Sequence, residues 1–126
     1  MLANILIVES EPSVRKLLQR ALERVGYAVQ GVGTDVEALR LCRTGPVDLV
    51  LADVGLPATG HELARTVAMQ CPRTRVVLMA AWYSECEDCP YVSQCRTIAK
   101  PFQMESVVAT IGEVLAAPLQ GTRGAS

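Results

Sequence analysis

The amino-acid sequence predicts a single α/β domain in which helices flank a five-stranded parallel sheet. Short apolar segments typical of strands alternate with segments whose apolar residues recur every three or four positions, as on one face of a helix. Residues 47–52 form a largely apolar run, typical of a strand that is buried on both faces. Strands that alternate with helices are joined by right-handed crossovers, and they therefore lie parallel.

The predicted strands, in chain order, are residues 3–8, 27–32, 47–52, 75–80 and 96–99. Each is short, rich in apolar or β-branched residues, and bounded by turn residues or by the signals that begin a helix. We expect the segment 27–32, which is less apolar than the first and third strands, to lie at an edge of the sheet.

The predicted helices are residues 12–25, 34–44, 61–70 and 104–115. The first has apolar residues at helical spacing from Val14 onward, and Gly26 ends it. Thr34 is suited to cap the second helix. For residues 83–95 we expect a short, distorted or displaced fourth helix, because Pro90 removes a backbone donor and clashes with the preceding turn.

Composition limits the class of protein. The chain has 126 residues, 50% of them hydrophobic, which suits one core, and its formal net charge is −1. Mixed charges do not indicate a general nucleic-acid or membrane surface. We see neither a signal peptide nor an apolar run of the ~20 residues that a membrane helix needs. We therefore expect a cytoplasmic protein with a domain over residues 1–118 and a loose tail over 119–126.

Charged residues follow three of the predicted strands. Glu9 follows the first strand, Asp53 the third and Lys100 the fifth. Ligands of such α/β domains bind where the carboxyl ends of the parallel strands meet. Two carboxylates and an ammonium group are suited to hold a divalent cation and a transferable phosphoryl group. The sequence therefore predicts that these three side chains meet in one small cleft.

With these features, the chain resembles the receiver domains of two-component response regulators over residues 3–117. Four segments carry the resemblance, in the right order and at the right strand ends: Ile5–Pro12, Asp48–Pro57, Val76–Ala81 and Ala99–Phe102. The resemblance implies a flavodoxin-like fold with strand order 2-1-3-4-5. It also implies that an aspartate accepts a phosphoryl group from a histidine kinase, with Mg²⁺, and that self-catalysed phosphorylation is the only enzymatic activity.

By this resemblance, Asp53 is the phosphoacceptor, and Lys100 contacts the phosphoryl oxygen. Pro101 is similar to the proline that follows the family's lysine, often after a cis bond. Glu9 matches the first acidic position, and Gly55 matches the residue whose backbone carbonyl binds the metal. The resemblance thus implies Glu9, Asp53 and Gly55 as the ligands of Mg²⁺.

Two departures from the family pattern weaken this site. Ser10 stands where the family has an aspartate that ligates Mg²⁺, and Ala80 stands where it has a Ser or Thr that follows the phosphoryl group. A serine hydroxyl is a weaker ligand than a carboxylate and carries no charge. Glu11 is a candidate to compensate, but the direction of its side chain cannot be read from the sequence. We therefore expect weak Mg²⁺ binding and weak or absent phosphorylation. Lys100 would then pair directly with Asp53 and close the site without a metal.

Residues 82–96 differ most from the family, which usually has a helix and a Gly-Ala turn there. They contain Cys86, Cys89 and Cys95, a spacing typical of thiolates that bind zinc or an iron–sulfur cluster. A fourth ligand would have to come from Cys71, Asp88 or a second chain. Two alternatives remain open: cysteines that face the core of a short helix, or a disulfide formed in air.

The sequence leaves three functions in competition. The first is a degenerate receiver, with weak or absent phosphorylation, that acts by protein–protein contact. The second is a working phosphoacceptor that tolerates Ser10. The third is a thiol or metal sensor that uses Cys86, Cys89 and Cys95 on a receiver scaffold. The expected partner is a histidine kinase or another signalling protein, without direct nucleic-acid or membrane contact, and a homodimer stays open.

Overall fold

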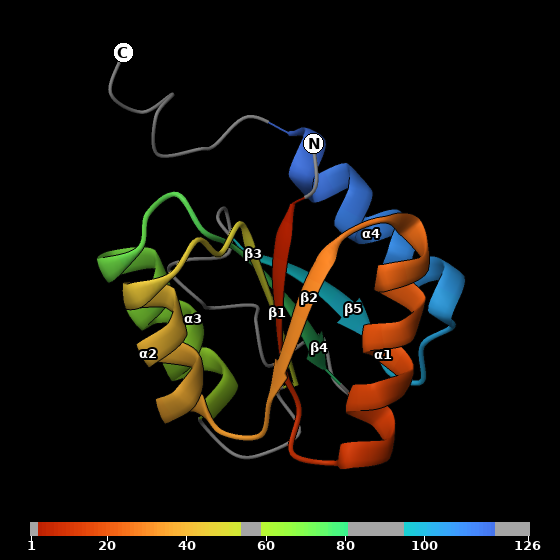
Figure 1. The fold of residues 1–126 in the computed structure, drawn as a ribbon, viewed down its shortest axis with the longest axis horizontal. Coiled ribbons are helices and arrows are strands. Elements are labelled where there is room, and N and C mark those ends of the chain that lie inside the picture. Colours follow the sequence, from red (N-terminus) through yellow and green to blue (C-terminus); the bar gives the residue numbers. More distant parts are fainter. Residues whose placement is uncertain (1–2, 54–58, 81–94, 118–126) are drawn as a thin grey trace.

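The computed structural model of the chain describes residues 3–53, 59–80 and 95–117. Its centre is a five-stranded sheet, parallel throughout, with strand order β2-β1-β3-β4-β5 (Figure 1). The strands are β1 (Asn4–Val8), β2 (Ala28–Val32), β3 (Leu49–Asp53), β4 (Arg75–Ala80) and β5 (Cys95–Ala99). The predicted sheet, its strand order and the edge position of the second strand are therefore confirmed.

Four helices are described: α1 (Pro12–Val25), α2 (Asp35–Thr44), α3 (Thr59–Gln70) and α4 (Met104–Ala116). Figure 1 shows α2 and α3 on one face of the sheet and α1 and α4 on the other. The segment expected to form a distorted helix lies outside the described residues, except that β5 already begins at Cys95. No helix in the described part of the chain is long and apolar enough to cross a membrane.

Each central strand contributes apolar side chains to two separate layers of the core. In β1, Ile5 and Ile7 pack in the layer beneath α1 and α4. Leu6 and Val8 pack in the opposite layer, beneath α2 and α3. Because both faces are covered, consecutive residues of a central strand are all apolar, and this accounts for the continuous apolar runs in the sequence.

The third strand begins at Leu49, later than the sequence pattern predicts. A polar residue, Asp48, nevertheless holds the segment before the strand against β1. Asp48 precedes β3, and its carboxylate accepts a hydrogen bond of 2.7 Å from the backbone N–H of Asn4. Its own N–H donates to the Asn4 carbonyl at 2.8 Å. Asp48 thus ties the start of β3 to β1, and β3 extends through Asp53 at the far end.

Specific residues fix the helix ends that lead into and out of the sheet. Pro12 occupies the first turn of α1, where its missing N–H costs no helical hydrogen bond. The Thr34 hydroxyl accepts a hydrogen bond of 3.3 Å from the backbone N–H of Glu37, so it caps α2 as predicted. Gly26 ends α1 with φ of 115°, a left-handed conformation that side chains other than glycine rarely adopt.

We predict that Gly26→Ala lowers the free energy of unfolding by about 1 kcal/mol, because alanine is strained in the left-handed region. Gly45→Ala is the matched control, since Gly45 ends α2 with φ of −134°. A β-carbon there would lie 3.5 Å from the Leu41 carbonyl oxygen, which is an ordinary contact. Urea denaturation of both variants measures the difference, and equal midpoints would contradict this explanation of Gly26.

Candidate functional site

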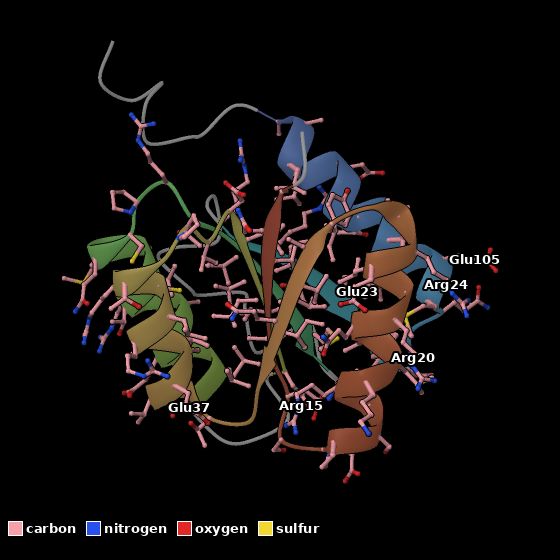
Figure 2. All side chains as sticks on the ribbon, viewed as in Figure 1. Arg15, Arg20, Glu23, Arg24, Glu37 and Glu105 are labelled. Atoms are coloured by element: carbon pink, nitrogen blue, oxygen red, sulfur yellow. The ribbon has the colours of Figure 1, made fainter. Side chains whose placement is uncertain are left out.

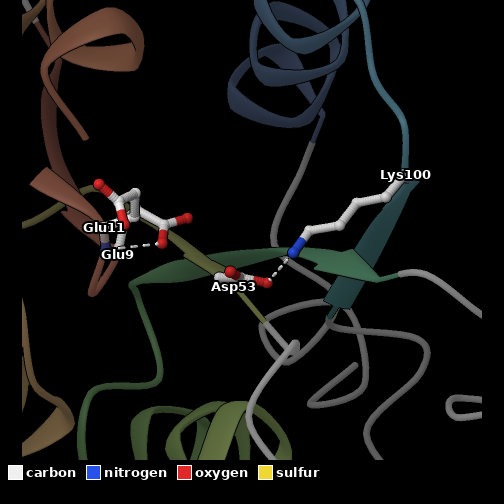
Figure 3. A network of polar contacts seen from close by, with 4 residues as sticks. All are labelled: Glu9, Glu11, Asp53 and Lys100. Carbon is white, nitrogen blue, oxygen red and sulfur yellow. Dashed lines mark hydrogen bonds and ion pairs between the residues drawn. The ribbon is translucent and has the colours of Figure 1, made fainter. Parts of the chain in front are cut away.

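Three strands bring charged residues to the carboxyl edge of the sheet. Glu9 directly follows β1, Asp53 is the last residue of β3, and Lys100 directly follows β5. β1 and β3 are neighbours, whereas β4 lies between β3 and β5. Figure 3 shows that the extended side chain of Lys100 reaches across to the carboxylate of Asp53. The predicted meeting of the three residues is therefore what the sheet topology produces.

The ammonium group of Lys100 forms an ion pair and a hydrogen bond with Oδ1 of Asp53. The two side chains are only 28% and 20% exposed, respectively. Partial burial reduces screening by water and salt, so this pair is stronger than a typical surface pair. This is the direct lysine–aspartate pairing expected from the sequence, and the Lys100–Pro101 peptide bond that follows is cis.

Glu9 is held more tightly than the sequence could indicate. The residue is almost fully buried, with 4% of its surface exposed. Its Oε2 atom accepts a hydrogen bond of 3.0 Å from the Glu11 backbone N–H. Its own N–H donates to the Val32 carbonyl at 3.0 Å, and Nη1 of Arg15 donates to its carbonyl oxygen at 2.7 Å. The backbone of Glu9 is thus held by β2 and α1, and its carboxylate by the loop after β1.

The surroundings of Glu9 favour its neutral form. Burial raises the pKa of the Glu9 carboxyl, and the neighbouring charge and hydrogen bond of Asp53 raise this pKa further. The hydrogen bond from Glu11 and the positive charge of Lys100 act in the opposite direction without reversing the shift. Two carboxyl groups therefore share a small, partly buried site. Ionising both of them costs free energy, because their negative charges repel each other.

The oxygen atoms at this edge suit a hard divalent cation. Mg²⁺ is typically held by one or two carboxylates with phosphate and water, and Glu9 and Asp53 supply two neighbouring carboxylates. Ser10 is exposed and adds no charge. The side chain of Glu11 accepts a hydrogen bond of 3.1 Å from the Ser13 hydroxyl, so it is turned toward the start of α1. Gly55, the expected carbonyl ligand, lies outside the described residues.

The cysteine hypothesis gains no support from the residues that the structure describes. Cys86, Cys89 and the side chain of Cys95 lie outside that part of the chain. Within it, no three His, Cys, Asp or Glu side chains are grouped so that they could hold a metal. Cys71, one candidate for a fourth ligand, instead donates through its Sγ to the Cys42 carbonyl oxygen at 3.6 Å.

The environment of Cys42 is also unlike that of a thiolate ligand. Burial, with a smaller contribution from Cys71, raises the pKa of the Cys42 thiol to about 11. A thiol with this pKa stays protonated at neutral pH, whereas metals bind the thiolate. Cys42 and Cys71 thus serve as packing residues between α2 and α3.

Sequence reasoning missed Arg15 as part of the site. The available signal was indirect: a glycine inside a predicted strand, Gly31, often marks the close approach of another group. In the structure that group is the side chain of Arg15.

The comparison with protein families identifies the chain. Residues 5–112 match the family model described as the response regulator receiver domain. This chain therefore belongs to the response regulator receiver domain family, and it is a receiver domain of two-component signalling.

Individual relatives agree with this assignment. The chain is 26% identical over 117 residues to the response regulator receiver protein CpdR of Brucella abortus, covering 90% of this chain and 98% of CpdR. It is 30% identical over 118 residues to the sensor kinase CckA of the same organism, covering 90% of this chain but only 12% of CckA. The chain thus spans a small part of some relatives and almost the whole of another.

Solved structures agree as well. The response regulator protein TrrA of Thermotoga maritima, solved in complex with the histidine kinase ThkA, is 25% identical to this chain with a TM-score of 0.79. The likeness covers 91% of this chain and 100% of the TrrA chain.

We predict that Glu9→Gln makes stability less sensitive to pH. Because the folded-state pKa of Glu9 is raised above 4.5, folding holds a proton that the unfolded chain releases near pH 4.5. The stability that this proton contributes is present below pH 4.5 and is lost as the pH rises through the folded-state pKa. As the pH rises, the free energy of unfolding of the wild type should therefore fall relative to that of Glu9→Gln. The fall should be about 1.4 kcal/mol for each unit by which folding raises the pKa of Glu9.

Urea denaturation from pH 4.5 to neutral pH measures this difference. The exposed carboxylate Glu105 on α4 provides a control, since Glu105→Gln removes a formal charge outside the site. If the free energies of unfolding of the wild type and Glu9→Gln change in parallel with pH, folding does not raise the pKa of Glu9 as described above.

Proposed function

We propose that this receiver domain is a weak phosphoacceptor at Asp53 and signals chiefly through contact with a histidine kinase or another signalling protein. The observation that carries the proposal is the cluster at the carboxyl edge of the sheet. There, Lys100 pairs with Asp53, and a buried Glu9 carboxyl neighbours Asp53. A nucleophilic carboxylate, a fixed cation and a second carboxylate are the groups that phosphoryl transfer onto aspartate requires.

Transfer would proceed by attack of an Asp53 carboxylate oxygen on the phosphorus of the donor. The new oxygen–phosphorus bond forms as the bond between phosphorus and the donor breaks. The electron pair of the broken bond leaves with the donor. Such a reaction depends on in-line positioning and on neutralisation of the phosphoryl charge. Lys100 supplies a positive charge at the acceptor carboxylate. Mg²⁺, when held by Glu9 and Asp53, supplies further charge neutralisation.

Four features make this acceptor weak. Ser10 leaves the cation with two neighbouring carboxylates instead of three. Burial and the neighbouring Asp53 raise the pKa of Glu9, so protons compete with a cation for this carboxylate more than they do at an ordinary glutamate. Lys100 already occupies one oxygen of Asp53, so a cation has to compete with an existing ion pair. Ala80, at the end of β4, has no hydroxyl with which to bind the phosphoryl group.

The relatives support the choice of partner. TrrA was solved in complex with the histidine kinase ThkA and also with Mg²⁺ and BeF. By analogy, we expect this domain to dock on a histidine kinase, which would place it in the cytoplasm, and to make no direct contact with nucleic acid. We retain residues 1–118 as the receiver domain, with 119–126 as a tail. No described residue favours a thiol or metal sensor.

We predict that Ser10→Asp raises both Mg²⁺ affinity and phosphorylation by a small phosphodonor. Mg²⁺ affinity should rise tenfold or more, since an added carboxylate about 4 Å from a cation contributes on the order of 1–4 kcal/mol. Ser13→Asp is the matched control, because Ser13 is exposed and the introduced aspartate adds the same charge at the start of α1. Intact mass after incubation with the phosphodonor and Mg²⁺ gives the extent of labelling.

Two further variants complete this test. Asp53→Asn should abolish labelling in every background. Adding Ala80→Ser to Ser10→Asp should raise the rate of Asp53 labelling, because a lost donor to a transferred phosphoryl group typically costs about 10²–10³ in rate. The same double variant should also restore a conformational response to labelling. A wild-type protein that binds Mg²⁺ and labels as readily as Ser10→Asp would show that the domain is an ordinary phosphoacceptor.

A further inference from the structure

Arg15 extends from α1 toward the sheet, although it lies on a helix whose other arginines are exposed. In Figure 2 its side chain lies between α1 and β2, whereas Arg20 points away from the sheet. The guanidinium Nη1 atom donates a partly buried hydrogen bond of 2.7 Å to the backbone carbonyl of Glu9. A hydrogen bond from a charged donor is about twice as strong as a neutral one, so this contact is a firm restraint on the end of β1.

Two glycines leave the space that this arginine occupies. A β-carbon at Gly31 would lie 2.9 Å from Cγ and 3.0 Å from Cδ of Arg15. A β-carbon at Gly33 would lie 3.2 Å from Nη1 of the same side chain. Gly31 lies in β2 and Gly33 directly follows the strand, so neither residue has a β-carbon in the space that Arg15 occupies. Any larger residue at Gly31 would push the stem of Arg15 away.

The restraint acts on the peptide group that links Glu9 to Ser10. The N–H of Glu9 is already bonded to Val32, and its carboxylate accepts from the N–H of Glu11. The carbonyl is the remaining polar group of this residue, and Arg15 binds it. The Glu11 N–H belongs to the next peptide group along the chain, so an arginine that holds the Glu9 carbonyl also restrains the backbone that carries the donor to the Glu9 carboxylate.

We propose that Arg15 is a positioning residue for the acidic site, acting on the Glu9 carboxylate through the Glu9 carbonyl, and that Gly31 and Gly33 seat it. The proposal rests on the function proposed above, because it assigns Arg15 to the cation-binding cluster of that same site. Arg15 bonds the carbonyl and not the carboxylate, so its effect on the cation is indirect.

Arg15→Met and Arg15→Lys separate packing from hydrogen bonding. Methionine keeps an apolar stem over Gly31 but cannot donate, whereas lysine retains a charged donor. In the Ser10→Asp background, for which we predict tighter Mg²⁺ binding, Arg15→Met should weaken Mg²⁺ affinity about tenfold, as the loss of a supporting contact typically does. Arg15→Lys should recover part of this loss. Arg20→Met, on the same helix, should leave the affinity unchanged.

A double-mutant cycle with Glu9→Gln tests whether Arg15 works through Glu9. When Glu9 has already lost its charge, Arg15→Met should cost little further Mg²⁺ affinity. If the tenfold loss persists in full in the Glu9→Gln background, Arg15 does not act through this carboxylate and the proposal fails. Gly31→Ala provides a second route to the same contact, and it should reproduce part of the effect of Arg15→Met without changing the arginine.

Amide hydrogen exchange tests the same claim without a cation. Arg15→Met should accelerate exchange of the Glu11 amide, whereas Arg20→Met should not. Unchanged exchange in both Arg15→Met and Gly31→Ala would overturn the positioning role, whatever the Mg²⁺ affinity. Faster Glu11 exchange in a protein that binds no Mg²⁺ would uphold the positioning role and would instead count against the cation site proposed above.

Discussion

The ion pair between Lys100 and Asp53 is the interaction on which the character of the site depends. It joins residues that leave the sheet from β5 and β3, with β4 between them. A long, flexible side chain can bridge that gap, and the parallel strands bring both of these strand ends to one edge. The pair offsets the charge of the aspartate, and in doing so it occupies an oxygen that a cation or a phosphoryl donor would need. On the function proposed above, affinity for Mg²⁺ and readiness for phosphorylation would both follow from this competition.

The buried carboxyl of Glu9 makes the competition more severe. In a site with three carboxylates, a divalent cation offsets most of the negative charge. With serine at position 10, the site holds two carboxyl groups and one lysine. Burial and the proximity of Asp53 raise the pKa of Glu9, which shows that two negative charges at this edge oppose each other. Serine at position 10 therefore removes one ligand and one negative charge, and it leaves Lys100 as the group that offsets Asp53.

Much of this arrangement could be predicted from the sequence, for a specific reason. The apolar runs of β1 and β3 and the alternation with helices determine a parallel sheet, and a parallel sheet necessarily places Glu9, Asp53 and Lys100 at one edge. The role of Arg15 could not be predicted, because an arginine on an amphipathic helix usually faces solvent. The direction of Glu11 could not be predicted either, since its hydrogen bond with Ser13 depends on side-chain rotamers.

Lys100→Met gives the most direct test of the central claim that Lys100 competes with Mg²⁺ for Asp53. Calorimetric titration of MgCl₂ into this variant should show tighter binding than in the wild type, because the competing ammonium group is gone. Labelling of Asp53 by a small phosphodonor should nevertheless become slower, because the variant lacks the charge that offsets the phosphoryl group. Lys16→Met, an exposed change on α1, controls for net charge. Mg²⁺ binding that is equal to or weaker than that of the wild type in Lys100→Met would contradict the account.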